Sequence, residues 1–148
     1  MTSFTSDNAR EACPSATTLP GAALVYAIAA VACALFGAVY EAFSHGVYSY
    51  FMIYAFAFPL VLGVVPCLVM MRCGACAPGR IATNAWNSGV ATLAVGSLLI
   101  GAFEIYGTTN RLVVVYPVVG LALLVAGLVR YVADVRKRGQ RRLFEDLY

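Results

Sequence analysis

The chain has 148 residues, of which 61% are hydrophobic and only 11% are charged, and its formal net charge is +3. Soluble domains normally carry about 25% charged residues, so this composition excludes an ordinary water-soluble globular protein. No folded basic domain accompanies the small positive charge, and we therefore expect no binding of nucleic acid.

The predicted elements begin with a polar tail over residues 1–18, which we expect to be disordered and cytoplasmic. Four continuous apolar stretches follow at 21–43, 49–71, 85–106 and 112–133. Each holds about 22 residues and spans about 33 Å as a helix, which suits a hydrocarbon core of about 30 Å. Barrel strands alternate apolar and polar residues, and these stretches do not. The sequence therefore predicts an all-α membrane protein, with a four-transmembrane-helix bundle over residues 19–133.

The ends of the first and third spans resemble each other. Segment 35–43 reads LFGAVYEAF and segment 99–106 reads LIGAFEIY. With one gap, both run Leu, apolar, Gly, Ala, aromatic, Glu, apolar, aromatic. Each is followed by a turn and by a span with a mid-membrane proline, Pro59 or Pro117. A hairpin duplicated in parallel orientation explains this pattern, and chance alignment of apolar segments is the open alternative.

The link between the second and third spans contains Gly74, Pro78 and Gly79, which we expect to end the second helix. Thr83 or Asn84 is then expected to cap the third helix.

Small residues recur along the spans at intervals that suit helix packing. They are Ala30, Ala34, Ala38 and Ala42 in the first span, Gly96 and Gly101 in the third, and Ala122 and Ala126 in the fourth. Such residues let helix backbones approach closely in lipid. They fit contacts within one bundle and equally fit an interface between chains.

Lysine and arginine near the span ends predict the orientation. If the N-terminus is cytoplasmic, Arg111 is the one outer residue among the 10 Lys and Arg residues. This asymmetry predicts a multi-pass protein of the cell membrane (inner or plasma) with both termini cytoplasmic. The basic tail over 134–148 is expected to contact anionic lipid headgroups. Its cationic residues are Arg136, Lys137, Arg138, Arg141 and Arg142.

Two carboxylates stand out near the outer ends of the spans. Glu41 and Glu104 lie in the last turns of the two outward-running helices, Arg111 opens the fourth span at the same level, and His45 follows Glu41 by four residues. Carboxylates and an imidazole at this depth are able to bind a cation or relay protons. In the structural alternative, a Glu–Arg pair locks the outer turns together.

Cysteines at 73 and 76 form a CxxC motif. Four-span thiol oxidoreductases, such as the quinone-linked disulfide-forming enzymes, act on the outer or lumenal side and need a second cysteine pair. The charge rule places this motif inside, where thiols stay reduced, and Cys13, Cys33 and Cys67 form no second CxxC. A zinc site with these two ligands would need a partner chain. We therefore predict no metal and no cofactor, and we disfavour a membrane enzyme or thiol protein that uses Cys73 and Cys76, although the sequence leaves this third function open.

The segments SGVATL at 88–93 and EIYGTT at 104–109 resemble a family of small four-span bacterial membrane proteins with no known activity. The resemblance covers mainly the third span. It implies the same four-span architecture and supplies no activity.

Two functions are favoured by the sequence over a membrane enzyme or thiol protein. The first is an accessory or scaffold subunit of a larger membrane assembly, either as a homo-oligomer or with a membrane-protein partner. The second is a small channel or transporter that uses the outer-leaflet Glu, His and Arg residues.

Overall fold

The computed structural model describes residues 18–44, 48–74, 78–108 and 111–145, and among these the side chains of all but 18, 138 and 141–145. Every regular element in this part of the chain is helical. Four segments are long and apolar enough to cross a membrane: Leu19–Phe43, Tyr50–Cys73, Arg80–Ile105 and Arg111–Lys137. The predicted all-α protein with four membrane-length helices is therefore confirmed, and the predictions for 1–17 and 146–148 fall outside the described residues.

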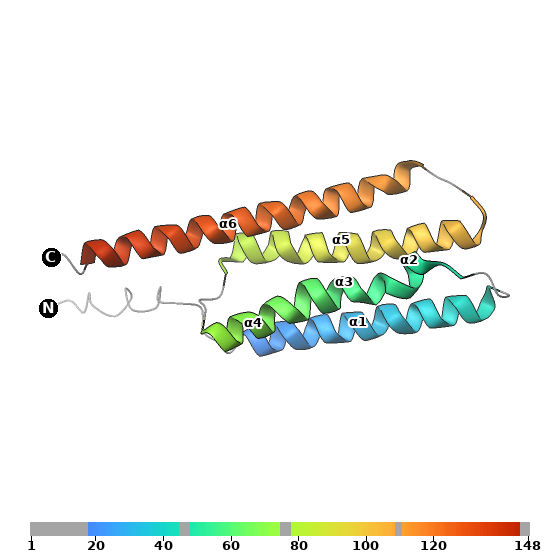
Figure 1. Cartoon of the computed structure of the whole chain (residues 1–148), viewed down its shortest axis with the longest axis horizontal. Coiled ribbons are helices and arrows are strands. Elements are labelled where there is room, and N and C mark those ends of the chain that lie inside the picture. The colour runs from blue at the N-terminus through green and yellow to red at the C-terminus, as the bar shows by residue number, and fades with distance from the viewer. Residues whose placement is uncertain (1–17, 45–47, 75–77, 109–110, 146–148) are drawn as a thin grey trace, which may run out of the picture.

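Three of the four spans are built on long helices. They are α1 (Thr18–Phe43), α5 (Arg80–Ile105) and α6 (Val115–Glu145), and the short 3-10 turn η3 (Arg111–Val114) precedes α6. Figure 1 shows them running lengthwise beside one another. We call the end that carries Ser44, Ser49 and Tyr106 the hairpin end, and the end where α1 begins and α6 finishes the terminal end.

The second span is broken into five short pieces. They are α2 (Tyr50–Ile53), the 3-10 turn η1 (Tyr54–Phe56), α3 (Ala57–Pro59), the π-helical η2 (Leu60–Val64) and α4 (Val65–Cys73). Pro59 and Pro66 stand on either side of the π-helical piece. Because proline lacks an N–H and clashes with the preceding turn, these two residues interrupt the regular α-helical ladder.

The spans pack as neighbours in chain order. α1 lies along the second span, the second span lies along α5, and α5 has its most extensive contact with α6. α1 and α6 make little or no contact, so the bundle is open between them. A two-fold axis relating two duplicated hairpins would pair α6 with α1 as it pairs the second span with α5. The structure therefore lends no support to the duplicated arrangement.

Glycines allow the close contact between α5 and α6. A Cβ built on Gly89 would lie 3.0 Å from the Gly120 carbonyl oxygen, and one built on Gly120 would lie 3.2 Å from that of Gly89. About two turns further along α6, a Cβ on Gly127 would lie 3.1 Å from the Trp86 nitrogen. The two backbones therefore touch along this seam, as small residues permit in lipid.

The predicted small-residue stripes divide into buried and exposed positions. In α1, Ala30 is buried, whereas Ala34, Ala38 and Ala42 are exposed. Each step of four residues rotates about 40° around a helix, so this stripe turns from the second span toward the outside. In α5, Gly96 and Gly101 are buried at helix contacts as expected. The pair in α6, Ala122 and Ala126, is exposed.

The ends of the helices agree in part with the predictions. Gly74 adopts the left-handed conformation (φ 58°) and ends α4, as expected for this link. The prediction that Thr83 or Asn84 caps the third helix is wrong, because α5 already begins at Arg80 with Gly79 as its N-cap. Thr83 lies within the helix, and its hydroxyl donates to the Gly79 carbonyl at 3.1 Å.

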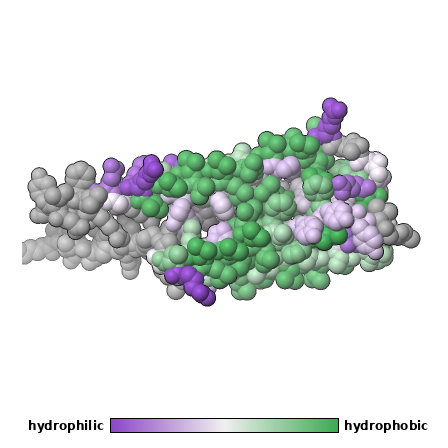
Figure 2. All heavy atoms as spheres, in the orientation of Figure 1, coloured by the Kyte–Doolittle hydropathy of each residue, from purple (hydrophilic) through white to green (hydrophobic). Residues whose placement is uncertain are grey.

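The fourth helix continues without interruption past the predicted end of its span. α6 has 31 residues and is therefore about 47 Å long, which exceeds the hydrocarbon core. It extends beyond the other helices at the terminal end (Figure 1). In Figure 2, a broad hydrophobic belt covers the middle of the molecule and hydrophilic atoms gather near its ends. This distribution matches four helices placed across a bilayer.

Candidate functional site

The carboxylate of Glu104 is bound at the hairpin end. Ser49 donates its hydroxyl hydrogen to Glu104 Oε2 at 2.6 Å, which joins the start of the second span to the end of α5. Ser49 is 1% exposed, so this hydroxyl is shielded from its surroundings by protein. A bond from a buried hydroxyl to a carboxylate is among the stronger hydrogen bonds in proteins. Glu104 therefore holds these two spans together.

Ser49 is positioned by a close approach of three segments. A Cβ on Gly37 of α1 would lie 3.1 Å from the Met52 carbonyl oxygen. From the other side, a Cβ on Gly101 of α5 would lie 2.8 Å from Met52 Cβ and 3.1 Å from Ser49 Oγ. The start of the second span is thus clamped between two glycines, which the sequence comparison had paired as equivalent residues.

Glu41 lies in the last turn of α1 at the same end of the molecule. Its Oε1 atom is buried and has no hydrogen-bond partner among the described residues. Its backbone carbonyl accepts bonds from both the Ser44 amide (3.1 Å) and the Ser44 hydroxyl (2.9 Å), which terminates the helix. A buried carboxylate oxygen without a donor is costly, because it has lost its water without a replacement. It is the one side-chain atom of this kind in the described part of the chain.

Aromatic rings connect the ends of α1 and α5 beside these carboxylates. The rings of Tyr40 and Tyr106 meet edge to face with centroids 6.5 Å apart. Phe36 stacks on Tyr40 one turn earlier, at 6.1 Å. Such pairs contribute about 0.5–1.5 kcal/mol beyond the area they bury. The hairpin end is therefore held by an aromatic contact as well as by the Ser49–Glu104 bond.

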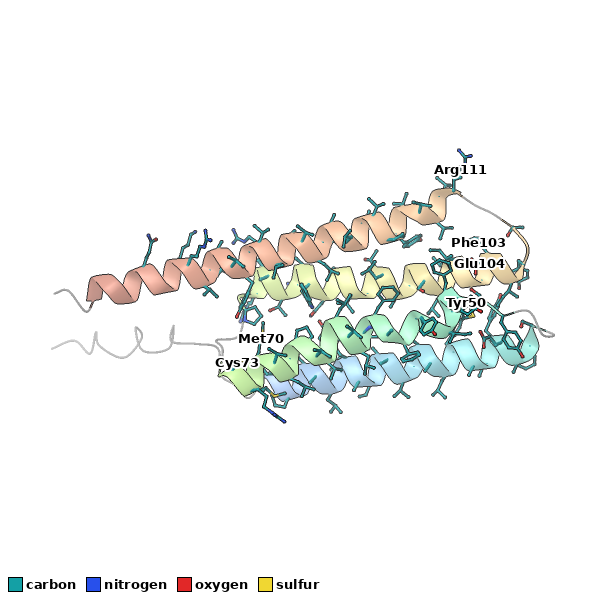
Figure 3. All side chains as sticks on the ribbon, in the orientation of Figure 1. Tyr50, Met70, Cys73, Phe103, Glu104 and Arg111 are labelled. Carbon is teal, nitrogen blue, oxygen red and sulfur yellow. The ribbon has the colours of Figure 1, made fainter. Side chains whose placement is uncertain are left out.

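The other two predicted site residues do not join this cluster. Arg111 is exposed and its side chain points away from the bundle, whereas Glu104 lies on α5 near Tyr50 (Figure 3). The predicted Glu–Arg pair is thus not formed among the described residues. His45 falls outside the residues that the structure describes. The structure joins Ser49 to Glu104 and places Glu41 at the same end of the molecule, and the sequence had not indicated Ser49.

A second set of polar contacts runs along the seam between α5 and the broken second span. Trp86 Nε1 donates to the Leu62 carbonyl oxygen at 2.7 Å. In a regular α-helix, the Leu62 carbonyl would accept a hydrogen bond from the N–H of residue 66, but Pro66 has no N–H. Ser97 donates to the Phe51 carbonyl at 2.5 Å, where α2 changes into the 3-10 turn. Side chains of α5 therefore donate to two backbone carbonyls of the irregular span, where lipid supplies no donor.

A further polar contact joins α1 and α5 at an exposed position. The Tyr26 hydroxyl donates to Asn87 Oδ1, and the Tyr26 ring covers Gly63 of the π-helical piece. A Cβ on Gly63 would lie 2.2 Å from the ring, so only glycine fits there. Hydrogen bonds of this type between membrane helices contribute about 0.6 kcal/mol on average.

The cysteines and the basic tail offer no assembled site in the described residues. Cys33, Cys67 and Cys73 are free thiols, and Cys73 is exposed at the end of α4 (Figure 3). The second cysteine of the CxxC motif, at position 76, lies outside the residues that the structure describes. The described residues hold no cluster of three or more metal-ligating side chains.

In the basic tail, Arg136 and Lys137 project from α6 as exposed cations. Three further predicted headgroup contacts, Arg138, Arg141 and Arg142, lie on the same helix, but their side chains fall outside the described set.

No protein-family model, curated protein or solved structure matches this chain, so its candidate site is defined by its own geometry alone.

Proposed function

We propose that the protein is an accessory or scaffold subunit of a larger membrane assembly. The observation that supports this proposal is the exposed alanine face of α1, formed by Ala34, Ala38 and Ala42. Alanines four residues apart form the small-xxx-small pattern that lets a second helix approach closely in lipid. Since none of the described helices occupies the alanine face, the partner is a helix of another chain.

The openness of the bundle is a second argument for a partner. α1 is covered by the second span and has only slight contact with α5, and its side toward α6 is free. By contrast, the buried glycines of α5 are all occupied by contacts within the chain. A helix with one packed side and one unfilled small-residue side is suited to join two chains.

The use of the polar side chains of α5 also favours a structural role. Trp86, Ser97 and Glu104 each bind a group of the second span. Polar residues that line a transport pathway generally face a water-filled cavity. Here they fasten helices instead, which is what a scaffold requires.

The first test is purification in mild detergent followed by native mass spectrometry. We expect the wild-type chain to carry a stoichiometric partner, which is either a second copy or another membrane protein. Replacing Ala34 and Ala38 together by leucine keeps the surface apolar but fills the alanine face, and should release that partner. Ala32→Leu is the matched control because Ala32 is exposed on α1 but lies off this face. A wild-type chain that is monomeric at native expression levels would contradict the proposal.

A second candidate function, a cation or proton site, is favoured by the orphan oxygen Glu41 Oε1. Ionisable groups inside a membrane protein are costly and frequently mark ion pathways. The Ser49 hydroxyl, Glu41 and Glu104 together offer hard oxygen ligands of the type that bind cations. This candidate corresponds to a small channel or transporter that uses Glu41 and Glu104 without Arg111.

Liposome flux separates the two candidates. If the hairpin end conducts, the wild-type protein should move protons or small cations, and Glu41→Gln should abolish the flux while the protein stays folded. Glu145→Gln, a change on α6 beyond the membrane, serves as the control. Absence of flux from wild-type liposomes for protons, alkali cations and divalent metals would eliminate the channel candidate and leave the scaffold proposal intact.

A further inference from the structure

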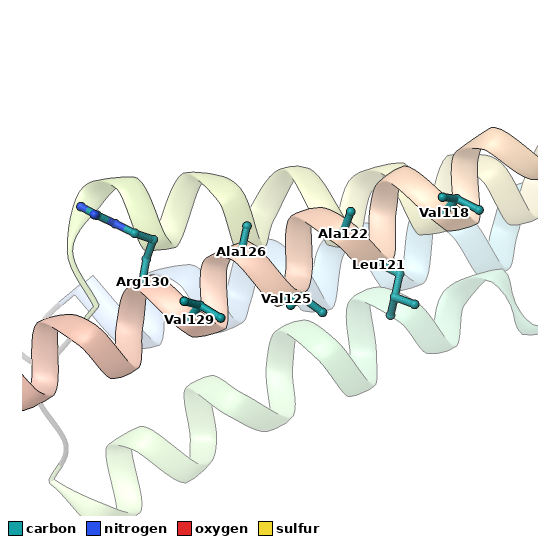
Figure 4. Close-up of a pocket in the computed structure, with 7 residues that line it drawn as sticks. All are labelled: Val118, Leu121, Ala122, Val125, Ala126, Val129 and Arg130. Atoms are coloured by element: carbon teal, nitrogen blue, oxygen red, sulfur yellow. The ribbon is translucent and has the colours of Figure 1, made fainter.

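The face of α6 that points away from α5 carries a shallow apolar depression. α6 packs on α5 through Gly120, Leu124 and Gly127, all of which are buried. On the opposite side, six apolar residues between Val118 and Val129 line the depression, and Arg130 closes one end (Figure 4). The small side chains of Ala122 and Ala126 lie between larger ones and make the surface concave there.

The length of the depression matches one leaflet of a bilayer. Val118 and Val129 are eleven positions apart, which corresponds to about 17 Å along a helix. Half of a hydrocarbon core of about 30 Å is about 15 Å. The depression therefore extends from the membrane boundary to about the bilayer centre, the path of a single acyl chain.

Arg130 lies where the headgroup of such a lipid would be. The neighbouring contacts fix its level: Gly127 packs on Ala82 and Trp86, and the Asp134 carboxylate lies beside Gly79 at the start of α5. Arg130 is thus level with the first turn of α5, at the membrane boundary of the terminal end.

Arg130 is exposed and forms no ion pair in the described structure. Asp134 is the acidic group nearest to it on α6, and its carboxylate faces the amino end of α5, where a negative charge is favourable. The positive charge of Arg130 is therefore available to a ligand.

We propose that this face binds one anionic phospholipid, with its phosphate at Arg130 and one acyl chain along the depression. A second copy of the chain is a poorer occupant, because a parallel copy would bring two Arg130 side chains and two basic tails together. This inference does not depend on the scaffold proposal, which concerns α1.

The test is native mass spectrometry of the full chain in detergent, titrated with dioleoyl phosphatidylglycerol and, separately, with dioleoyl phosphatidylcholine. We expect one tightly retained phosphatidylglycerol and no equivalent phosphatidylcholine. Arg130→Gln should weaken this first binding event about fivefold, the factor that corresponds to about 1 kcal/mol per base near a membrane surface. Arg136→Gln is the matched control, since Arg136 is an exposed cation of the same helix outside the depression.

A second variant tests the apolar part separately from the charge. Ala122→Leu combined with Ala126→Leu fills the depression without changing any charge, and should also weaken the first phosphatidylglycerol. Equal losses from Arg130→Gln and Arg136→Gln would overturn the proposal, because they would indicate additive attraction without a site. Equal binding of the two lipids would overturn it as well. A wild-type complex that contains a second copy of the chain, and that Ala122→Leu with Ala126→Leu abolishes, would also overturn it. The depression would then be an interface between two chains.

Discussion

The second and fourth spans run in the same direction and each contains a proline, yet their backbones differ. The second span passes through α, 3-10 and π geometry within 24 residues, whereas α6 is one helix of 31 residues. The difference follows from their neighbours. α1 and α5 flank the second span on both sides, but among the described helices α6 is packed mainly on α5.

The comparison indicates when a membrane helix tolerates a break. Carbonyls released by proline or by a change of helix type need new donors, because lipid supplies none. The second span receives donors from Trp86 and Ser97 of α5. α6 exposes most of its circumference, so no neighbour could supply such donors there. The longest irregular stretch of backbone is therefore located where the chain is covered on two sides, and the fourth span has only the short 3-10 turn η3 at its start.

The largest effect is expected from breaking the one contact that holds α6. Gly120→Leu places a side chain against Leu93 Cγ, which lies only 2.7 Å from the ideal Cβ position, and against the Gly89 carbonyl. Overpacking at a backbone contact should cost about 3 kcal/mol and detach α6. Thermal unfolding followed by circular dichroism, together with limited proteolysis of α6, measures this effect. Gly139→Leu is the control, since a Cβ there meets nothing within 4 Å. Equal stability of the two variants would contradict the one-sided packing of α6.

The next effect concerns the donor for the broken span. Trp86→Phe removes the N–H that serves the Leu62 carbonyl and should cost about 1–3 kcal/mol, the penalty for a buried polar group left without a partner. Pro66→Ala returns a backbone N–H to the same turn. In that background, Trp86→Phe should therefore cost much less, and a double-mutant cycle measured by thermal unfolding reports the difference. Additive effects would show that Trp86 does not compensate for Pro66.

The four spans were predictable because length and apolar composition are local properties of the chain. The end of α4 at Gly74 was also predictable, since a left-handed residue after a helix is a local preference. The early start of α5 was not. Residues 80–84 are polar enough to end an apolar stretch, yet nothing in them stops a helix.

The candidate site was predicted only in part because its partners are distant in sequence. Glu104 was identified from its depth, but its partner Ser49 is 55 residues away and belongs to another hairpin. Arg111 has the charge and the level to pair with a carboxylate, and only its direction in space excludes this (Figure 3). A signal for Trp86 did exist: Pro66 frees a carbonyl inside a span, so a donor had to be found on a neighbouring helix.

A smaller effect separates hydrogen bonds between helices from those within one helix. Ser97→Ala leaves the Phe51 carbonyl without this donor and should cost about 1 kcal/mol. Thr92→Ala is the matched control on the same helix, because the Thr92 hydroxyl bonds the Ser88 carbonyl of its own helix at 2.7 Å. The Ser88 carbonyl remains within the regular hydrogen-bond ladder of α5, so Thr92→Ala should change the free energy of unfolding by close to zero. Thermal unfolding of both variants tests the difference, and equal losses would argue against a special role for α5.

The smallest effect should come from the proline of the fourth span. The sequence analysis treated Pro117 as the counterpart of Pro59, but the two differ in helical context, because Pro117 is the third residue of α6 whereas Pro59 lies inside the second span. The N–H groups of a first helical turn have no acceptor within the helix, so proline is tolerated there. Pro117→Ala should therefore change the free energy of unfolding by less than about 0.5 kcal/mol, the range of neutral substitutions. Pro59→Ala, on the other hand, restores an N–H inside the broken span and should regularise its backbone, which amide hydrogen exchange of residues 54–64 would detect. Pro117→Ala could instead alter amide exchange in α6 as strongly as Pro59→Ala alters it in the second span. The two prolines would then be equivalent, and the number of neighbouring helices would not explain why the two spans differ.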